Sequence, residues 1–226
     1  RYRERTLVPA VFDDAAEIAH FHESLEDTLK EAHSDDTNIT LEELKTSALF
    51  PPFALAYHGR CVRHLKEQYA KLFAGCLPQH PRPIRRQRRR VGFVVTAQHE
   101  GIFLRCLGGL VKRLDREQLE PLVLCSQSIV GKIKQGLQDA DLPVIGFANT
   151  LPAAIDAIRD ADCDVLHYWE VGSDAINYYL AHARLAPVQC TSWGSQSTTG
   201  IPTIDYFLSS PLIEPENAQD HYSEKL

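Results

Sequence analysis

The feature that most limits how this chain can fold is a regular alternation of short apolar runs with helical segments, which begins at residue 91. Parallel strands need long crossover connections, and a helix between two strands is the usual one. The alternation therefore predicts an α/β fold, in which a parallel sheet carries helices on both faces. The predicted strands are 91–96, 119–125, 142–147, 164–169, 186–193 and 204–210, and the predicted helices are 102–115, 129–138, 152–161 and 174–184.

Residues 1–80 show a different pattern, which predicts a small all-helical region ahead of the sheet. The segment 13–33 places apolar side chains along one stripe of a helix, and so does the segment 59–73. Thr40 and Glu43 have the spacing of a capping box, in which two side chains cap the start of a helix. The sheet-containing lobe would then follow this helical region.

Residues 81–90 lie between the two regions and contain six arginines and two prolines. Such a segment could contact a phosphate or an acidic partner, or it could be an extended, solvated linker. The whole chain has 24 Lys and Arg residues against 30 Asp and Glu residues, a net charge of −6. One short basic run in an acidic chain favours the linker, and this composition gives no support for nucleic-acid binding.

Composition and cysteine spacing bear on the cellular compartment. The sequence contains no apolar run that approaches the roughly 20 residues of a membrane span, and no apolar segment of a signal peptide near its start. None of the six cysteines forms a CxxC pair, so they are interpreted as buried free thiols of a reducing compartment. These features predict a cytoplasmic protein without a membrane partner. The cysteines are Cys61, Cys76, Cys106, Cys125, Cys163 and Cys190.

Ligands of an open parallel sheet bind beyond the carboxyl ends of its strands, so the residues that follow each strand are candidates for a site. Polar residues follow four of the predicted strands, at 97–101, 126–128, 170–174 and 194–200. His99 stands between a strand and a helix, where it could act as a base or donate to a phosphate or sugar oxygen. The alternative is a histidine that nearby backbone groups satisfy.

Three other features of the same edge are candidates for binding. Glu170 offers a carboxylate, although a single glutamate after a strand is more often only solvated. Trp193 offers a flat apolar face that suits the C–H face of a sugar ring, or else it covers the core at the base of its loop. The loop 194–200 is rich in hydroxyl groups, which can pair with a polyhydroxylated ligand. His167, within a predicted strand, is assigned to core packing.

Several motifs that would specify another chemistry are absent. No GxGxxG follows the first strand, which argues against an NAD enzyme, and neither GxxxxGK[ST] nor HExxH occurs. The absence of these motifs predicts that neither a metal nor a cofactor is needed.

Short identities gather near the end of the chain, within 184–226. They are "APVQ" at 186–189, Gly194, "TTG" at 198–200, "IPTIDY" at 201–206 and "YSEKL" at 222–226. This stretch resembles the catalytic region of the O-linked N-acetylglucosamine transferases, glycosyltransferase family 41, in its bacterial form. "RVGFV" at 90–94, followed by His99, is similar to the opening strand and histidine of the family's first catalytic half. "FALAYHGR" at 53–60 resembles the segment that joins helical repeats to the catalytic core.

The resemblance implies a two-lobed glycosyltransferase fold of the B type. This chain would hold the helical joining region and, at 91–226, the Rossmann-like first lobe. The nucleotide-binding lobe, with its phosphate-holding lysine, would follow residue 226 in a longer parent, and tetratricopeptide repeats would precede the chain. The fragment alone is therefore expected to be inactive, because half of the active site would be missing.

The resemblance also implies roles for individual residues. His99 matches the histidine near the donor phosphate and the attacking hydroxyl, and it is the predicted catalytic residue. The loop that lines the donor sugar departs from the family, because Ser195 and Gln196 replace a Tyr-Pro pair. Glu170 could replace an acid that bacterial members carry after the fourth strand. The predicted substrate-binding residues are Trp193, Gly194, Ser195, Gln196, Thr198, Thr199 and Glu170.

The implied reaction is an inverting, metal-independent transfer of N-acetylglucosamine from UDP-N-acetylglucosamine, or a related UDP-sugar, to a Ser or Thr hydroxyl of a protein acceptor. One alternative is a lobe that has kept the fold and lost the chemistry, and that serves as a binding or scaffold module. The departures in the loop are the reason to keep this alternative. Another is a different sugar-nucleotide enzyme, such as an epimerase, against which the "APVQ" and "YSEKL" matches speak.

Overall fold

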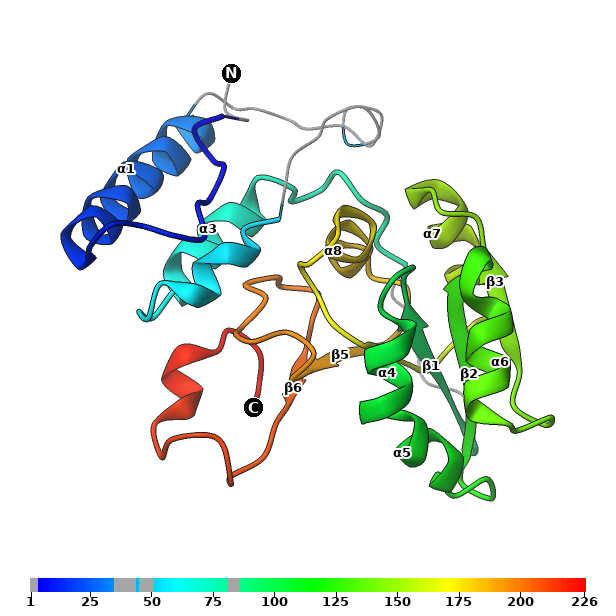
Figure 1. Cartoon of the computed structure of the whole chain (residues 1–226). Coiled ribbons are helices and arrows are strands. Elements are labelled where there is room, and N and C mark those ends of the chain that lie inside the picture. The colour runs from blue at the N-terminus through cyan, green and yellow to red at the C-terminus, as the bar shows by residue number, and fades with distance from the viewer. Residues whose placement is uncertain (1–3, 35–43, 45–50, 81–85) are drawn as a thin grey trace.

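A single six-stranded parallel sheet organises the chain (Figure 1). The structure, a computed structural model, describes residues 4–34, 44, 51–80 and 86–226. The spatial order of the strands is β3-β2-β1-β4-β5-β6, and every neighbouring pair is parallel. The strands are β1 (Arg89–Val95), β2 (Leu119–Ser126), β3 (Val144–Phe147), β4 (Val165–Tyr168), β5 (Val188–Ser192) and β6 (Tyr206–Leu208).

Helices connect the first five strands, as the alternation in the sequence predicts. The helix predicted over 102–115 is two helices in the structure, α4 and α5, which meet at Leu107 just before the pair Gly108 and Gly109. Two successive glycines weaken a helix, because each loses more backbone freedom than other residues do. The helices are α1 (Ala15–Ser34), α3 (Arg63–Lys71), α4 (Glu100–Cys106), α5 (Gly108–Arg113), α6 (Val130–Leu137), α7 (Leu151–Asp160) and α8 (Ala175–His182), with short 3-10 turns at Phe53–Tyr57, Gln127–Ile129 and Ala218–His221.

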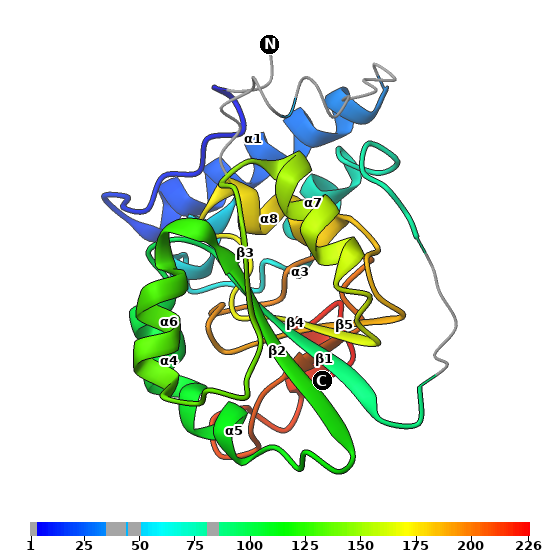
Figure 2. The ribbon, with the colours of Figure 1, turned by 90° about the vertical axis from the view of Figure 1, so that its right-hand side faces the viewer.

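The two faces of the sheet bury separate apolar clusters. Helices α4, α5 and α6 cover one face of the sheet (Figure 2). Phe93 and Val95 of β1 belong to the apolar cluster on that face, together with Phe103 and Ile133. Val94, one position along, points to the opposite face, under α7 and α8. This alternation follows from the period of two residues in a strand, and it explains why the strands read as continuous apolar runs.

The helical region packs on the face of the sheet that α8 covers, and it shares one core with it. The ring of Phe73 lies 6.0 Å from that of Tyr178 and 5.2 Å from that of Tyr179, both on α8. Leu25 and Leu29 of α1 are buried in the same cluster as residues of the sheet. The helices of residues 4–80 are therefore held by the apolar surface of the lobe as well as by each other.

Two of the described arginines of the run at 81–90 contact acids of their own chain. Arg86 pairs with Asp162, and Arg90 pairs with Glu120 at 2.7 Å. Arg89 and Arg90 belong to β1, so the end of the predicted linker is part of the sheet. Residues 81–85 and the predicted capping box at 40–43 lie outside the described residues.

The cysteines are free, and their burial is mixed. Cys125, Cys163 and Cys190 are buried, which confirms the prediction of buried thiols for these three. The prediction is wrong for Cys61 and Cys106, which are exposed. Among the described residues, no helix is both long enough and apolar enough to cross a membrane.

Candidate active site

The first part of the site is the tight turn that follows β1. Gln98 adopts a positive φ of 74°, and the N–H of His99 donates to the carbonyl of Thr96 at 3.3 Å. The chain reverses there and α4 begins, with His99 at the N-cap position. The side chain of His99 retains 18% of its exposure, so it is partly buried but open to a ligand.

The second part is the segment after β4, which leads into α8. Glu170 is buried, and its two carboxylate oxygens accept from the hydroxyl of Ser173 at 2.6 Å and from the N–H of Ser173 at 3.2 Å. Asp174 caps α8, because its Oδ1 accepts from the N–H of Asn177 at 2.8 Å. The cap fixes the Asp174 carboxylate next to the end of β1.

The parallel pairing of β1 with β4 brings these two segments together at the carboxyl edge. The Nε2 of His99 lies 3.1 Å from the Oγ of Ser173, 3.3 Å from the Oδ2 of Asp174 and 3.8 Å from the Oε1 of Glu170. Thr96 also donates its hydroxyl to the Oδ2 of Asp174, at 2.6 Å. The sequence-predicted residues His99 and Glu170 are therefore neighbours, although 71 positions separate them in the numbering.

The environment shifts the pKa of each group in this cluster. The hydrogen bond to Asp174 raises the pKa of His99 against the effect of burial, and the nearby carboxylates of Glu170 and Asp174 raise it further. Burial raises the pKa of Glu170, although the hydrogen bonds from Ser173 oppose this effect. Burial also acts to raise the pKa of Asp174, but the hydrogen bonds from His99, the Asn177 N–H and Thr96 outweigh it and leave that pKa lowered. The neighbouring acids thus stabilise the protonated form of His99 relative to a free imidazole.

The same cluster has the composition of a possible cation site, since one ligand atom each of His99, Glu170 and Asp174 lies within 4.8 Å of the others. Its hydrogen bonding does not suit a cation. The Oδ2 of Asp174 already accepts from Thr96, and the His99 nitrogen that faces the carboxylates is in hydrogen-bond contact with Ser173. A cation would have to displace these hydrogen bonds, so we assign no metal to the cluster.

The third part of the site is the loop after β5, which packs directly on the end of β4. A Cβ at Gly194 would collide with the carbonyl oxygen of Trp169 and lie 3.0 Å from the Cβ of Glu170. Ser195 donates its hydroxyl to the carbonyl of Val171 at 3.1 Å. Only a glycine lets the backbone come this close, so the loop lies against Glu170.

The loop residues predicted to bind a sugar divide into two groups. Trp193 is 45% exposed, and Gln196 is exposed as well, so both are open to a ligand. Ser195, Thr198 and Thr199 are buried, and their hydroxyls are bonded within the chain. The hydroxyls of the second group therefore support the loop in this structure.

Two buried charged residues, Lys66 and Glu224, hold this loop. Glu224 accepts from the hydroxyl of Thr198 at 2.6 Å and from the N–H of Thr199 at 2.7 Å. Lys66 of α3 donates to the Oγ of Ser197 at 2.8 Å and to the carbonyl of Thr198 at 3.0 Å. Burial lowers the pKa of Lys66 to about 8, against the opposing effect of Glu224 and Glu170. The helical region and the "YSEKL" segment thus both fix the loop.

The sequence predictions missed several residues of the site. Asp174 could have been found, because an aspartate directly before a helical pattern is an N-cap signal. Thr96 ends a predicted strand at the correct edge of the sheet. Lys66 gave no signal, because a lysine in an amphipathic helix is normally assigned to the solvated face. Its burial depends on a loop that lies 131 positions away.

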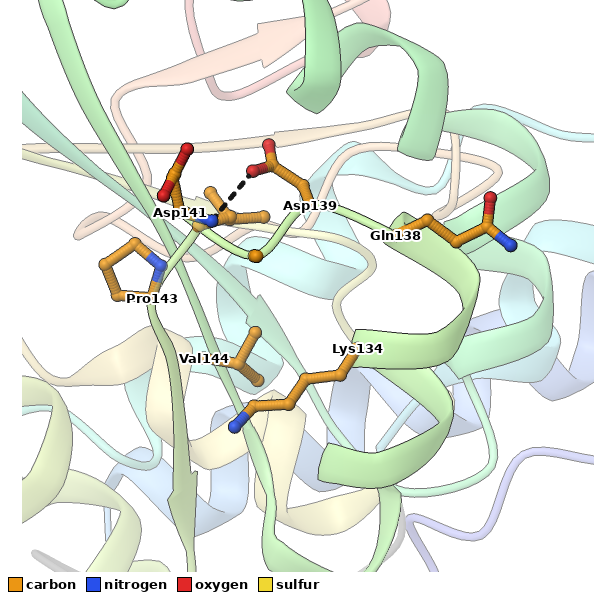
Figure 3. A pocket seen from close by; sticks show the side chains of 8 residues that line it. Lys134, Gln138, Asp139, Asp141, Pro143 and Val144 are labelled. Carbon is orange, nitrogen blue, oxygen red and sulfur yellow. Dashed lines mark hydrogen bonds between the residues drawn. The ribbon is translucent and has the colours of Figure 1, made fainter.

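Two of the hollows that the described residues form lie at different edges of the sheet. One, of about 520 Å³, lies between the starts of α7 and α8 and is lined by residues that include Thr150, Tyr179 and Ala175, which directly follows Asp174. The other, of about 620 Å³, lies where α6 ends and β3 begins (Figure 3). There, the N–H of Asp141 donates to Asp139 at 3.2 Å. Because this second hollow is at the amino end of β3, it is not part of the candidate site.

The fold is shared with a glycosyltransferase of known structure. The chain aligns with a point mutant of the Thermobaculum terrenum O-GlcNAc transferase with a TM-score of 0.59 and 19% sequence identity, over 94% of this chain and 41% of that chain. A segment of 43 residues, 19% of this chain, is 46% identical to 5% of the Solanum lycopersicum protein described as probable UDP-N-acetylglucosamine–peptide N-acetylglucosaminyltransferase SPINDLY. No protein-family model matches the chain.

These comparisons confirm two predictions from the sequence. The α/β fold with a small helical region at its start is the fold of one part of the bacterial transferase. The likeness to O-GlcNAc transferases extends over 94% of this chain at the level of the fold, and the chain spans 41% of that transferase. The chain is therefore similar in fold to the corresponding part of an O-GlcNAc transferase.

Proposed function

We propose that this chain is part of a glycosyltransferase that transfers a sugar, N-acetylglucosamine in the first instance, from a UDP-sugar to a Ser or Thr hydroxyl of a protein. The observation that carries the proposal is the contact of His99 with Asp174 and Glu170 at the carboxyl edge of the sheet. The fold shared with the bacterial transferase and the segment similar to the tomato protein support the choice of reaction.

The proposed reaction is one displacement at the anomeric carbon of the sugar. The acceptor oxygen forms a bond to that carbon while the bond from the carbon to the diphosphate breaks, and the configuration inverts. The acceptor hydroxyl gives its proton to His99, and UDP departs. Positioning of the acceptor and stabilisation of the departing charge account for most of such catalysis, so the proposal requires no metal or cofactor.

The exposed residues of the loop are the ones that we propose to contact the donor. Trp193 would stack on the sugar, and Gln196 together with the backbone of Gly194 would hydrogen-bond it. Ser195, Thr198 and Thr199 would contribute through the loop shape that they maintain. The hollow of about 520 Å³ beside Asp174 is large enough for an acceptor side chain.

The context of the chain belongs to the same proposal. A second lobe would bind the nucleotide, helical repeats in the parent would hold the protein acceptor, and the protein would work in the cytoplasm. Half of the proposed site would come from that second lobe. The described chain alone is then expected to be inactive as a transferase.

One observation favours a second candidate, a lobe that has kept the fold and serves as a binding module. The hydroxyls of Ser195, Thr198 and Thr199 have partners within the chain, so the loop offers a sugar fewer free groups than its composition suggests. A folded protein that binds UDP-N-acetylglucosamine without releasing UDP would fit this candidate.

The test is an assay of UDP release from UDP-N-acetylglucosamine with Ser- and Thr-rich acceptor proteins, performed with this chain joined to the lobe that follows it. His99→Ala should lower kcat/KM by about 10²- to 10⁴-fold, the usual contribution of a general base. His64→Ala is the matched control, because the side chain of His64 is 60% exposed and far from the cluster in sequence. Equal activity of wild type and His99→Ala would remove His99 from the reaction.

A further inference from the structure

The hydrogen bonds around His99 determine which of its two ring nitrogens carries the proton when the imidazole is neutral. A neutral imidazole has one nitrogen that donates and one that accepts, and the partners of each nitrogen decide the tautomer. For His99, two partners lie at Nε2, Ser173 at 3.1 Å and Asp174 at 3.3 Å.

Asp174 can only accept from His99. Its carboxylate has a lowered pKa, and its other bonds come from two donors, the hydroxyl of Thr96 and the N–H of Asn177. Ser173 also accepts at this point, because it gives its single hydroxyl proton to Glu170 at 2.6 Å. Both partners of Nε2 therefore need a proton from it.

The other ring nitrogen of His99, Nδ1, has no hydrogen-bond partner among the described residues. It differs from the Nδ1 of His167, which is closed off from solvent as well as unpartnered. A nitrogen that is free of protein partners and open to solvent is available to a substrate.

We infer that Asp174 holds His99 in the tautomer that carries its proton on Nε2, so that Nδ1 is the atom that takes a proton from the acceptor. The tautomer follows from the contacts alone, whereas the role of Nδ1 as a base rests on the proposed function. Asp174 is then a positioning residue, which acts on the reaction through His99. When Nδ1 takes its proton, the resulting imidazolium stays next to the carboxylates of Asp174 and Glu170.

Several charged groups face His99, and each belongs to a different element. Asp174 starts α8, Glu170 follows β4, and Glu100 begins α4. Glu100 is itself paired with Lys132 of α6 at 2.6 Å, so its effect on His99 is partly neutralised. Asp174 is the group in direct contact with the ring, and its removal should have the largest effect.

The test uses the 226-residue chain with ring-15N histidine, and it reads the tautomer and the titration midpoint of His99 from long-range 1H–15N NMR spectra. The signals that disappear from the spectrum of the His99→Gln variant are those of the His99 ring, which assigns them. In the wild type, the neutral form should be protonated on Nε2. Asp174→Asn keeps the helix cap, because Asn and Asp cap equally well, and it should lower the midpoint of His99 by about one unit or more.

Two matched variants separate positioning from a general loss of structure. Asp160→Asn removes an acid that is 72% exposed on α7 and should leave both readouts unchanged. Ser173→Ala should keep the Nε2 tautomer, because Asp174 remains. A neutral His99 protonated on Nδ1, or a midpoint that Asp174→Asn does not move, would overturn the inference. So would selective broadening of His99 by micromolar Mn²⁺, since Nε2 would then be a metal ligand.

These outcomes are independent of the proposed reaction, because the spectra need no substrate. If the tautomer is as inferred and no UDP is released by the longer protein, the proposed function fails and the inference stands. If the transferase is active, Asp174→Asn should shift the lower limb of its pH–rate profile by the same amount as it shifts the NMR midpoint.

Discussion

The surroundings of two buried histidines, His167 on β4 and His182 on α8, lower their pKa values, whereas the surroundings of His99 raise its pKa. Burial lowers the pKa of His167 to about 4 and the pKa of His182 to about 3. His167 contacts Ser192 at 3.1 Å, and the Nε2 of His182 is buried without a partner among the described residues. Both rings are therefore neutral in the folded chain.

Acid should destabilise the fold through these two residues. Their folded pKa values lie below the unfolded value of about 6.5, so the unfolded chain takes up protons first and stability falls as the pH falls below that value. Between pH 7 and pH 5, each histidine should cost about 2 kcal/mol of unfolding free energy. His182→Phe keeps the ring contacts with Phe73 and Tyr178 and should reduce the acid-induced loss by about that amount.

Urea unfolding at pH 7 and pH 5 measures this difference directly. His64→Phe, at a position that is 60% exposed, is the matched control and should lose as much stability as the wild type over this range. If His182→Phe loses as much stability as the wild type between the two pH values, burial of a neutral His182 is not a source of acid sensitivity.

At the scale of residues, the strand ends in the sequence were enough to select two members of the candidate site, and their roles stay predictions. His99 and Glu170 each come a few positions after a predicted strand, so the rule that ligands bind at the carboxyl edge was enough to select them. The contact of Ser173 with Glu170 depends on side-chain rotamers, and the contact of the Nε2 of His99 with Asp174 depends on the order of the strands in the sheet. Neither the rotamers nor the strand order can be read from the spacing of residues in the sequence.

At the scale of elements, two segments distant in the sequence hold the loop 194–200. Glu224 bonds it from the end of the chain, and α3 holds it through Lys66 and through the backbone that packs against Gly200. Gly200 has a φ of +74°, and a Cβ there would come within 2.5 Å of the Lys66 backbone. The position excludes side chains both by conformation and by space.

Gly200→Ala should therefore separate the loop from α3. We expect a loss of at least about 2 kcal/mol in unfolding free energy, from backbone strain together with the steric conflict. Amide exchange of residues 194–200 should accelerate more than that of β1, because the conflict is local. Urea unfolding and hydrogen-exchange mass spectrometry give the two readouts.

Gly131→Ala is the control for this experiment. Gly131 lies in α6, and a Cβ there would meet nothing within 4 Å. Its replacement should change stability by less than about 1 kcal/mol and should leave the loop unchanged. Equal effects of the two substitutions would show that the contact of Gly200 with α3 does not constrain the loop.

The elements themselves were largely predictable, and their failures have local causes. Each predicted strand overlaps an observed one, because a strand buried on both faces must be apolar throughout. The predicted helix 102–115 was wrong as a single element, since the chain breaks at Leu107, just before the helix-weakening pair Gly108 and Gly109. Apolar periodicity continues across such a break and does not reveal it.

At the scale of the whole molecule, one apolar cluster joins the helical region to the sheet. Phe73 is buried to 1% exposure, and its ring contacts Tyr178, Tyr179 and His182 of α8. The sequence predicted residues 1–80 as a region of its own from a change of pattern. The sequence did not reveal that this region shares a core with the sheet, because an amphipathic helix does not specify the surface that it covers.

The chain should consequently unfold as one unit. Far-UV circular dichroism, to which α1 and α3 contribute, and the fluorescence of Trp169 and Trp193 in the lobe should give the same midpoint in urea. Phe73→Ala should lower stability by about 3 to 5 kcal/mol, through the cavity that it leaves, and should shift both midpoints together.

Ile102→Ala is a suitable control, because Ile102 is 56% exposed on α4 and its truncation should have little effect. A Phe73→Ala variant in which the fluorescence midpoint stays at the wild-type value while the circular dichroism midpoint falls would show that the helical region unfolds independently.

The large sequence separation between Lys66 and its partner has a consequence for the synthesis of the chain. Lys66 precedes its partner Ser197 by 131 positions. At about 5 to 20 residues per second, a ribosome needs roughly 7 to 26 s to deliver that partner. Throughout this interval, the charged side chain of Lys66, which is buried in the folded chain, has to remain in water. Lys66 can therefore take its buried place only after the loop 194–200 has been made, later than α1, α3 and α8.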